Sequence, residues 1–189
     1  MQIDPLERSV NLSARELAVF RNQPLARSRS HSHSHWRANV GHQWHKRAEE
    51  EVRNTEPEAR FEVNVCANWR HSGWIFNLSG RIDQLLPSEN GFLIREIKTI
   101  RSPLPAAEET LIEQYGDYFA QAAIYQALLR VLPEYAHHSI KSEVQFINIE
   151  NGARQSVLLE SSEEKLFELQ LNRLIPFLNA RLASMKRLR

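Results

Sequence analysis

The chain has 189 residues, 42% of them hydrophobic, and a formal net charge of +1 at pH 7. A chain of this length and composition buries one good core, so we expect residues 1–189 to form a single α/β domain. The only cysteine, Cys66, excludes an intrachain disulfide framework. No segment has the length and apolarity of a signal peptide or a membrane span, which predicts a soluble cytoplasmic protein without a membrane partner.

The near-neutral net charge hides an uneven distribution of charged residues. Between Arg8 and Arg47, eight Lys or Arg residues accompany one acid, Glu16, and the stretch Arg181 to Arg189 adds four bases and no acid. Either region is a candidate phosphate-facing surface, although runs of charge are as often plain solvated faces. Acids gather instead between Glu49 and Glu62.

Three features are expected in the first third of the chain. Ser13 and Glu16 have the spacing of a capping box, which predicts the start of a first helix. The run from Arg27 to His35 alternates histidine with serine; alternating histidines chelate transition metals, but this polar composition favours a flexible loop. Residues 46–52 favour a second helix, on which His45 would share a face with Ala48.

The rest of the chain predicts the frame of a mixed sheet. Strands are expected at residues 61–67, 74–86, 92–100, 143–149 and 155–159, with turn signals at 87–91 and at Asn151-Gly152. Helices are expected at 108–132 and from a second capping box, Ser161 with Glu164, to the end of the chain. The resulting fold class is α/β, with a central mixed sheet of about five strands flanked by helices.

Charged side chains recur on the hairpin formed by residues 74–86 and 92–100. Because side chains alternate along a strand, Glu96 and Lys98 share one face while Ile97 points to the other. A loop at residues 88–91 places Asp83 opposite Glu96, with Cβ atoms roughly 5 Å apart. A hard cation such as Mg²⁺ relieves the repulsion between two such carboxylates. Taken alone, a Glu-x-Lys pair on a strand is more often a solvated ion pair.

Two further signals accompany the hairpin. On the helix expected at 108–132, Gln121 and Tyr125 are neighbours at positions i and i+4. Upstream, Gly41 and His45 open the second helix. Each has a simpler explanation, since Tyr125 suits a core position and a lone helical histidine is more often a surface residue.

Together these residues form four motifs in a fixed order. They are Gly-x-x-x-His (Gly41, His45), Gly-x-x-Asp (Gly80, Asp83), Glu-x-Lys (Glu96, Lys98) and Gln-x-x-x-Tyr (Gln121, Tyr125). Over residues 10–160 the chain resembles the RecB-type branch of the PD-(D/E)XK nuclease superfamily, which implies a restriction-endonuclease-like core. Its Ser13-Ala14-Arg15-Glu16-Leu17 start is similar to that of the N-terminal nuclease module of XPD/DinG-like DNA helicases. Residues 161–189 would then form a C-terminal helix that links to a helicase.

The resemblance implies a metal-dependent nuclease that hydrolyses phosphodiester bonds of single-stranded DNA or DNA ends. Its setting would be DNA repair or recombination at the nucleoid, with a helicase domain or subunit as partner. By hypothesis, His45, Asp83, Glu96 and the Ile97 carbonyl hold Mg²⁺ or Mn²⁺. Lys98 then orients the attacking water, while Gln121 and Tyr125 position this lysine or contact the phosphate backbone. Many relatives carry an iron–sulfur cluster on four cysteines, which this chain does not supply.

Two rival functions are compatible with the same fold. One is a clamp that binds nucleic acid for a helicase without cutting it, and the other is a restriction-type endonuclease that cuts at specific sequences. The presence of both acids and the lysine argues against the clamp. The residues leave open the choice between exonuclease and endonuclease, the polarity of cutting, and the acceptance of RNA.

Overall fold

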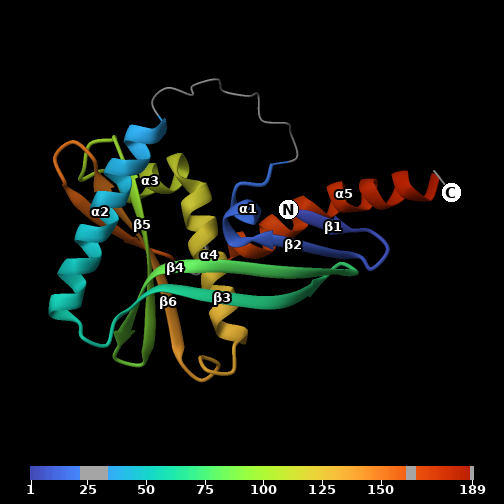
Figure 1. The fold of residues 1–189 in the computed structure, drawn as a ribbon, viewed down its shortest axis with the longest axis horizontal. Coiled ribbons are helices and arrows are strands. Elements are labelled where there is room, and N and C mark those ends of the chain that lie inside the picture. Colours follow the sequence, from blue (N-terminus) through green and yellow to red (C-terminus); the bar gives the residue numbers. More distant parts are fainter. Residues whose placement is uncertain (22–33, 161–164, 188–189) are drawn as a thin grey trace.

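The computed structural model describes residues 1–21, 34–160 and 165–187 (Figure 1). Its elements follow the chain in a mixed order. They are β1 (Gln2–Asp4), β2 (Ser9–Ser13), α1 (Ala14–Ala18), α2 (Ser34–Thr55), β3 (Arg60–His71), β4 (Trp74–Ser88), β5 (Gly91–Ile100), α3 (Glu108–Gln114), α4 (Gly116–Val131), β6 (Ser139–Asn148), β7 (Arg154–Leu158) and α5 (Leu166–Arg187).

The strands form one seven-stranded sheet in the order β1-β2-β4-β5-β6-β7, with β3 also paired to β4. The β2–β4 and β5–β6 pairs are parallel and the other pairs are antiparallel. The predicted α/β class with a mixed central sheet is therefore confirmed. The strand number was too low because β1 and β2, with three and five residues, are too short for a periodic pattern.

Several local predictions are confirmed. The Ser13 hydroxyl accepts a hydrogen bond from the Glu16 N–H at 3.1 Å, and the Glu16 carboxylate accepts one from the Ser13 N–H at 2.8 Å. The β4–β5 ladder includes Gln84 opposite Arg95, so its register is the one that sets Asp83 against Glu96. Pairing continues to Ser88 and Gly91, which shortens the predicted four-residue loop to two residues.

Other boundaries differ from the prediction. The helix expected at 108–132 is broken between α3 and α4 at Tyr115, whose backbone is not helical, and Gly116 follows with its low helix propensity. Helix α2 begins at Ser34, inside the run predicted as a loop; the part from Arg27 to His33 lies outside the described residues. The second predicted capping box, at Ser161 and Glu164, lies outside them as well.

Successive residues of β5 face the two helical layers. Ile97 is buried against Ala48 of α2 and Ile147 of β6, whereas Glu96 contacts Gln121 of α4. Helix α4 also packs with α1 and α5 around the larger core cluster. The sheet thus separates α2 from α4, as the alternation along the strand requires.

One edge of β4 is left without a partner strand near its centre, in the ranges that the structure describes. Strand β2 pairs with residues 75–79 of β4 and β5 pairs with residues 84–88, while β3 pairs with residues 74–85 from the opposite edge. Residues 80–83 therefore have no strand on the edge that β2 and β5 share, within the described part of the chain. At this gap, side chains from both layers approach each other.

None of the described helices combines the length and apolarity that crossing a bilayer requires.

Candidate active site

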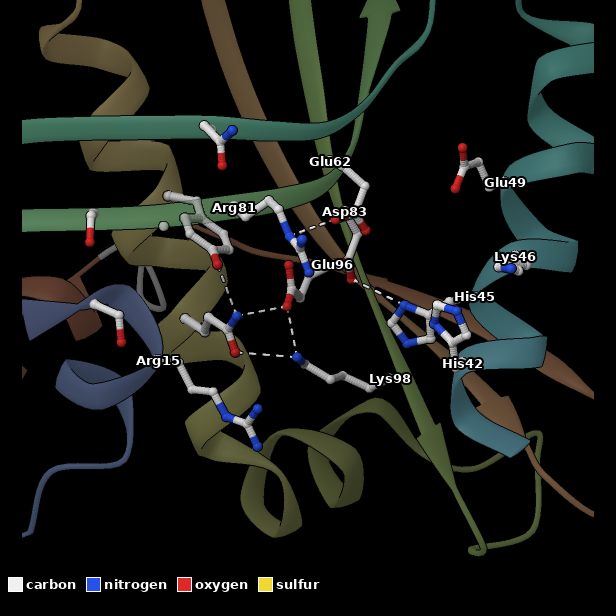
Figure 2. A pocket seen from close by; sticks show the side chains of 16 residues that line it. Arg15, His42, His45, Lys46, Glu49, Glu62, Arg81, Asp83, Glu96 and Lys98 are labelled. Carbon is white, nitrogen blue, oxygen red and sulfur yellow. Dashed lines mark hydrogen bonds and ion pairs between the residues drawn. The ribbon is translucent and has the colours of Figure 1, made fainter. Parts of the chain in front are cut away.

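A hollow of about 780 Å³ lies at the gap in the sheet, bounded by α1, α2, α4 and strands β3 to β5 (Figure 2). Its lining is largely polar. The lining residues are Ser13, Arg15, His42, His45, Lys46, Glu49, Glu62, Asn64, Ser79, Gly80, Arg81, Asp83, Glu96, Lys98, Gln121 and Tyr125. The structure thus brings the motif side chains, which are spread from His45 to Tyr125 in the sequence, into one depression.

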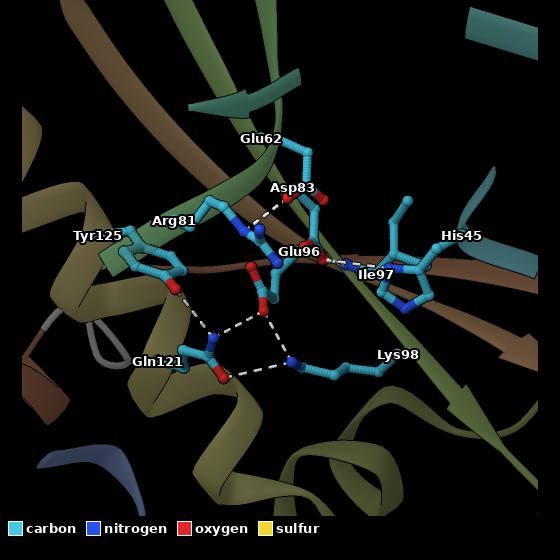
Figure 3. Close-up of polar contacts among 9 residues, drawn as sticks. All are labelled: His45, Glu62, Arg81, Asp83, Glu96, Ile97, Lys98, Gln121 and Tyr125. Atoms are coloured by element: carbon cyan, nitrogen blue, oxygen red, sulfur yellow. Dashed lines mark hydrogen bonds and ion pairs between the residues drawn. The ribbon is translucent and has the colours of Figure 1, made fainter. Parts of the chain in front are cut away.

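Four of these side chains form a continuous hydrogen-bonded network (Figure 3). Lys98 Nζ donates to Glu96 Oε1 at 2.7 Å and to Gln121 Oε1 at 3.2 Å. Gln121 Nε2 in turn donates to Glu96 Oε1 at 2.8 Å and to the Tyr125 hydroxyl at 3.1 Å. Gln121 therefore orients the acid and the lysine together, and Tyr125 fixes the orientation of Gln121.

Asp83 lies on the side of Glu96 away from Gln121 (Figure 3). Its Oδ2 accepts a hydrogen bond from the Ile97 N–H at 2.8 Å and lies 3.8 Å from Nδ1 of His45. His45 is carried by α2 and reaches Asp83 at the gap (Figure 3). The Ile97 side chain is buried on the α2 face of the sheet, so this residue contacts Asp83 through its backbone N–H alone.

Burial controls the charge states of the site. It raises the pKa of Glu96 to about 7, although the neighbouring Lys98 acts in the opposite direction. It likewise raises the pKa of Tyr125 to about 12, so the phenol stays protonated. Burial lowers the pKa of His45 against the attraction of Asp83, which favours the neutral imidazole. The second oxygen of Glu96, Oε2, is buried and has no hydrogen-bond partner among the residues that the structure describes.

Several lining residues were not predicted to belong to the site. Arg81 lies inside the Gly-x-x-Asp motif, and its Nε forms an ion pair with Oε2 of Glu62 at 2.5 Å. Tyr118 of α4 lies beside the hollow without lining it: its ring centroid is 5.1 Å from Lys98 Nζ, and its ring stacks on Tyr115. Arg15 lies within the Ser13 to Leu17 start, which was the available signal.

The structure leaves no room for a side chain at Gly80, the first residue of the Gly-x-x-Asp motif. A Cβ atom at this position would lie 2.4 Å from Cε1 of Tyr125 and 3.3 Å from Cβ of Ala14. We expect Gly80→Ala to displace Tyr125, to break its hydrogen bond with Gln121, and to lower the free energy of unfolding by about 1–3 kcal/mol. Urea titration measures this loss.

Gly116 provides the matched control for this substitution. A Cβ atom there meets nothing within 4 Å, so Gly116→Ala should leave stability unchanged or slightly higher. Equal stability of the two variants would contradict the steric explanation of Gly80.

Comparison with known proteins adds the family. The model of the PD-(D/E)XK nuclease superfamily matches residues 4–186, and the chain belongs to this superfamily. The superfamily is one of nucleases. A search of curated proteins found no significant match.

Solved structures resemble the fold at low sequence identity. The crystal structure of SSO0001 is 20% identical with a TM-score of 0.48, over 72% of this chain and 60% of that chain. A candidate exonuclease from Eubacterium rectale is 10% identical with a TM-score of 0.49, over 77% of this chain and 54% of that chain. The chain thus spans less than two thirds of the length of either structure.

Proposed function

We propose that this protein is a Mg²⁺- or Mn²⁺-dependent deoxyribonuclease that acts on single-stranded DNA or DNA ends. The observation that carries the proposal is the convergence of Asp83, Glu96 and Lys98 on one hollow, with Glu96 and Lys98 held by Gln121. Two acids beside a lysine are the groups that phosphodiester hydrolysis needs near a scissile phosphate. A non-cleaving clamp would have no use for a buried acid and lysine held in this geometry.

The residues present fit a divalent cation. Oε2 of Glu96 is a buried carboxylate oxygen to which no described residue donates a hydrogen bond, and Asp83 offers a second carboxylate beside the neutral ring of His45. The described residues contain no ready-made group of three or more His, Cys, Asp or Glu side chains. The side chains of His45, Asp83 and Glu96 therefore have to draw together when the cation binds, and waters complete its coordination. We propose His45, Asp83, Glu96 and the Ile97 carbonyl as these ligands.

When bound, the cation would supply Lewis acidity toward the phosphate and lower the pKa of a coordinated water. The chain's own groups do the rest. Lys98 orients the attacking water and offsets the negative charge that develops on the phosphate. Gln121 keeps the Lys98 ammonium beside Glu96, and Tyr125, protonated at neutral pH, holds the Gln121 amide.

The finer assignment rests on sequence motifs. We propose the RecB-type branch from the order of the four motifs, and a helicase domain or subunit as partner from the Ser13 to Leu17 start. DNA repair or recombination at the nucleoid would be the setting. We further propose one nuclease domain over residues 1–189, with a core at 10–160, a C-terminal helix at 161–189 that connects to the helicase, and no iron–sulfur cluster.

Incubation with end-labelled DNA in the presence of Mn²⁺ tests the function. Linear single strands, linear duplexes and circular single strands are compared, with EDTA as the control. Cleavage of the linear strands that EDTA abolishes supports the proposal, and the label pattern gives the polarity. Cleavage of circles identifies an endonuclease, and intact DNA in every reaction contradicts the proposal.

Metal affinity should depend on pH through Glu96. The pKa of this group in the folded protein is about 7, above its usual 4.5, so the carboxylate becomes fully available only above pH 7. In the metal-free protein, protonated Glu96 stabilises the folded state, and this contribution is lost as the pH rises from 4.5 through about 7. Mg²⁺ affinity should therefore fall about fivefold from pH 7 to pH 6 in calorimetric titrations, because the ionised fraction of Glu96 falls by about that factor. A pH-independent affinity over this range would contradict the role of Glu96.

A further inference from the structure

Arg15 is a basic residue of the hollow that the proposed chemistry leaves unused. It is exposed on α1, and its guanidinium has no hydrogen bond or ion pair with any residue in the described ranges. Two other bases at the hollow are paired, Arg81 with Glu62 at 2.5 Å and Lys98 with Glu96 at 2.7 Å. The N–H donors of Arg15 are thus available to a ligand, while its charge acts on Glu96 through space.

Arg15 stands where two hollows adjoin. The second hollow, of about 430 Å³, continues to Thr99 and Tyr118. The residues that it shares with the first are Arg15, His42, His45, Lys98 and Gln121. Asp83 and Glu96 line only the first hollow. Figure 2 shows the Arg15 side chain extending from α1 toward Lys98, on the side away from His45.

The backbone that carries Arg15 is well fixed. The Ser13–Glu16 capping box closes the first turn of α1, and Ala14 and Leu17 are fully buried. At the end of the helix, Gln170 of α5 donates a hydrogen bond from Nε2 to the Ala18 carbonyl at 2.6 Å. An arginine on such a support reaches its ligand with little loss of backbone entropy.

We propose that Arg15 binds the phosphate next to the scissile phosphate. This neighbouring phosphate belongs to the part of the DNA strand that runs from Asp83 and Glu96 past Lys98. This inference rests on the proposed nuclease function. A DNA strand whose scissile phosphate lies at Asp83 and Glu96 continues into the second hollow, and Arg15 lies at the boundary between the two hollows. A guanidinium binds phosphate oxygens through two parallel N–H donors, which a lysine does not reproduce.

Arg15→Gln tests the proposal, with Arg70→Gln as the matched control. Arg70 is an exposed base on β3 that lines neither hollow. Binding of a short fluorescein-labelled oligodeoxythymidine is measured by anisotropy with Mg²⁺, in the Lys98→Ala background, at salt concentrations from about 50 to about 200 mM. We expect Arg15→Gln to weaken binding about tenfold and to reduce the slope of log K against log salt by about 0.7. Arg70→Gln should change neither.

Cleavage kinetics provide the second measurement. With Lys98 intact, Arg15→Gln should raise KM about tenfold and leave kcat within about twofold, with Arg15→Lys between it and the parent protein. An unchanged affinity and salt slope, or a loss confined to kcat, would overturn the assignment of Arg15. Absence of cleavage by the parent protein would refute the nuclease function, whereas the binding experiment would still decide whether Arg15 contacts a phosphate.

Discussion

Replacing Lys98 by alanine should reduce DNA cleavage by a factor on the order of a hundred or more, while Mg²⁺ binding persists. The ammonium is the only base among the described residues that donates hydrogen bonds to both Glu96 and Gln121. Its removal leaves the developing phosphate charge without its nearest cation. Single-turnover cleavage of labelled single-stranded DNA under Mn²⁺ measures the loss.

Lys141 supplies the control for this substitution. It is an exposed lysine of β6 and lines neither the hollow at the gap nor the one beside it, so Lys141→Ala should cleave at the parental rate. Circular dichroism and thermal unfolding exclude a folding defect in the Lys98 variant. Retention of metal-dependent cleavage by a folded Lys98→Ala protein would remove this residue from the catalytic assignment.

The part of the site that sequence could predict follows from local periodicity. The two-residue period of a strand sets Glu96 and Lys98 on one face and Ile97 on the other, and the turn fixed the register of the hairpin. The helical period likewise sets Gln121 beside Tyr125. These relations depend on residues close in sequence, which is why a pattern predicts them.

The remainder depends on contacts between distant segments. The parallel pairing of β2 with β4 creates the gap in the sheet, but β2 has five residues and no periodic signature. The role of Gly80 becomes visible only when α4 brings Tyr125 against β4, 45 positions later. Arg15 resembles any surface arginine until α1 is placed beside the hollow. Tertiary packing, rather than local propensity, determines all three.

The acids of the site lead to the second large effect, a loss of metal binding. Asp83→Asn keeps an oxygen that accepts the Ile97 N–H, now 2.8 Å from Oδ2, but removes the negative charge. We expect the variant to lose most of its affinity for Mg²⁺ and to cleave DNA at least about a hundredfold more slowly, because the cation contributes several kcal/mol to the transition state.

Thermal unfolding with and without Mg²⁺ separates binding from catalysis. A cation at about 100 times its Kd stabilises the folded parent protein by about 2.7 kcal/mol, and Asp83→Asn should abolish most of the resulting rise in Tm. Glu62→Gln is the matched control, because Glu62 is a carboxylate of the same hollow that is already paired with Arg81. It should retain the full rise in Tm.

If both variants lost this rise equally, the cation would be held by the general negative charge of the hollow; if neither did, Asp83 would not be a ligand. Loss in Asp83→Asn alone would therefore place the cation at the gap between β2 and β5, next to Oε2 of Glu96, which accepts no hydrogen bond from the described residues.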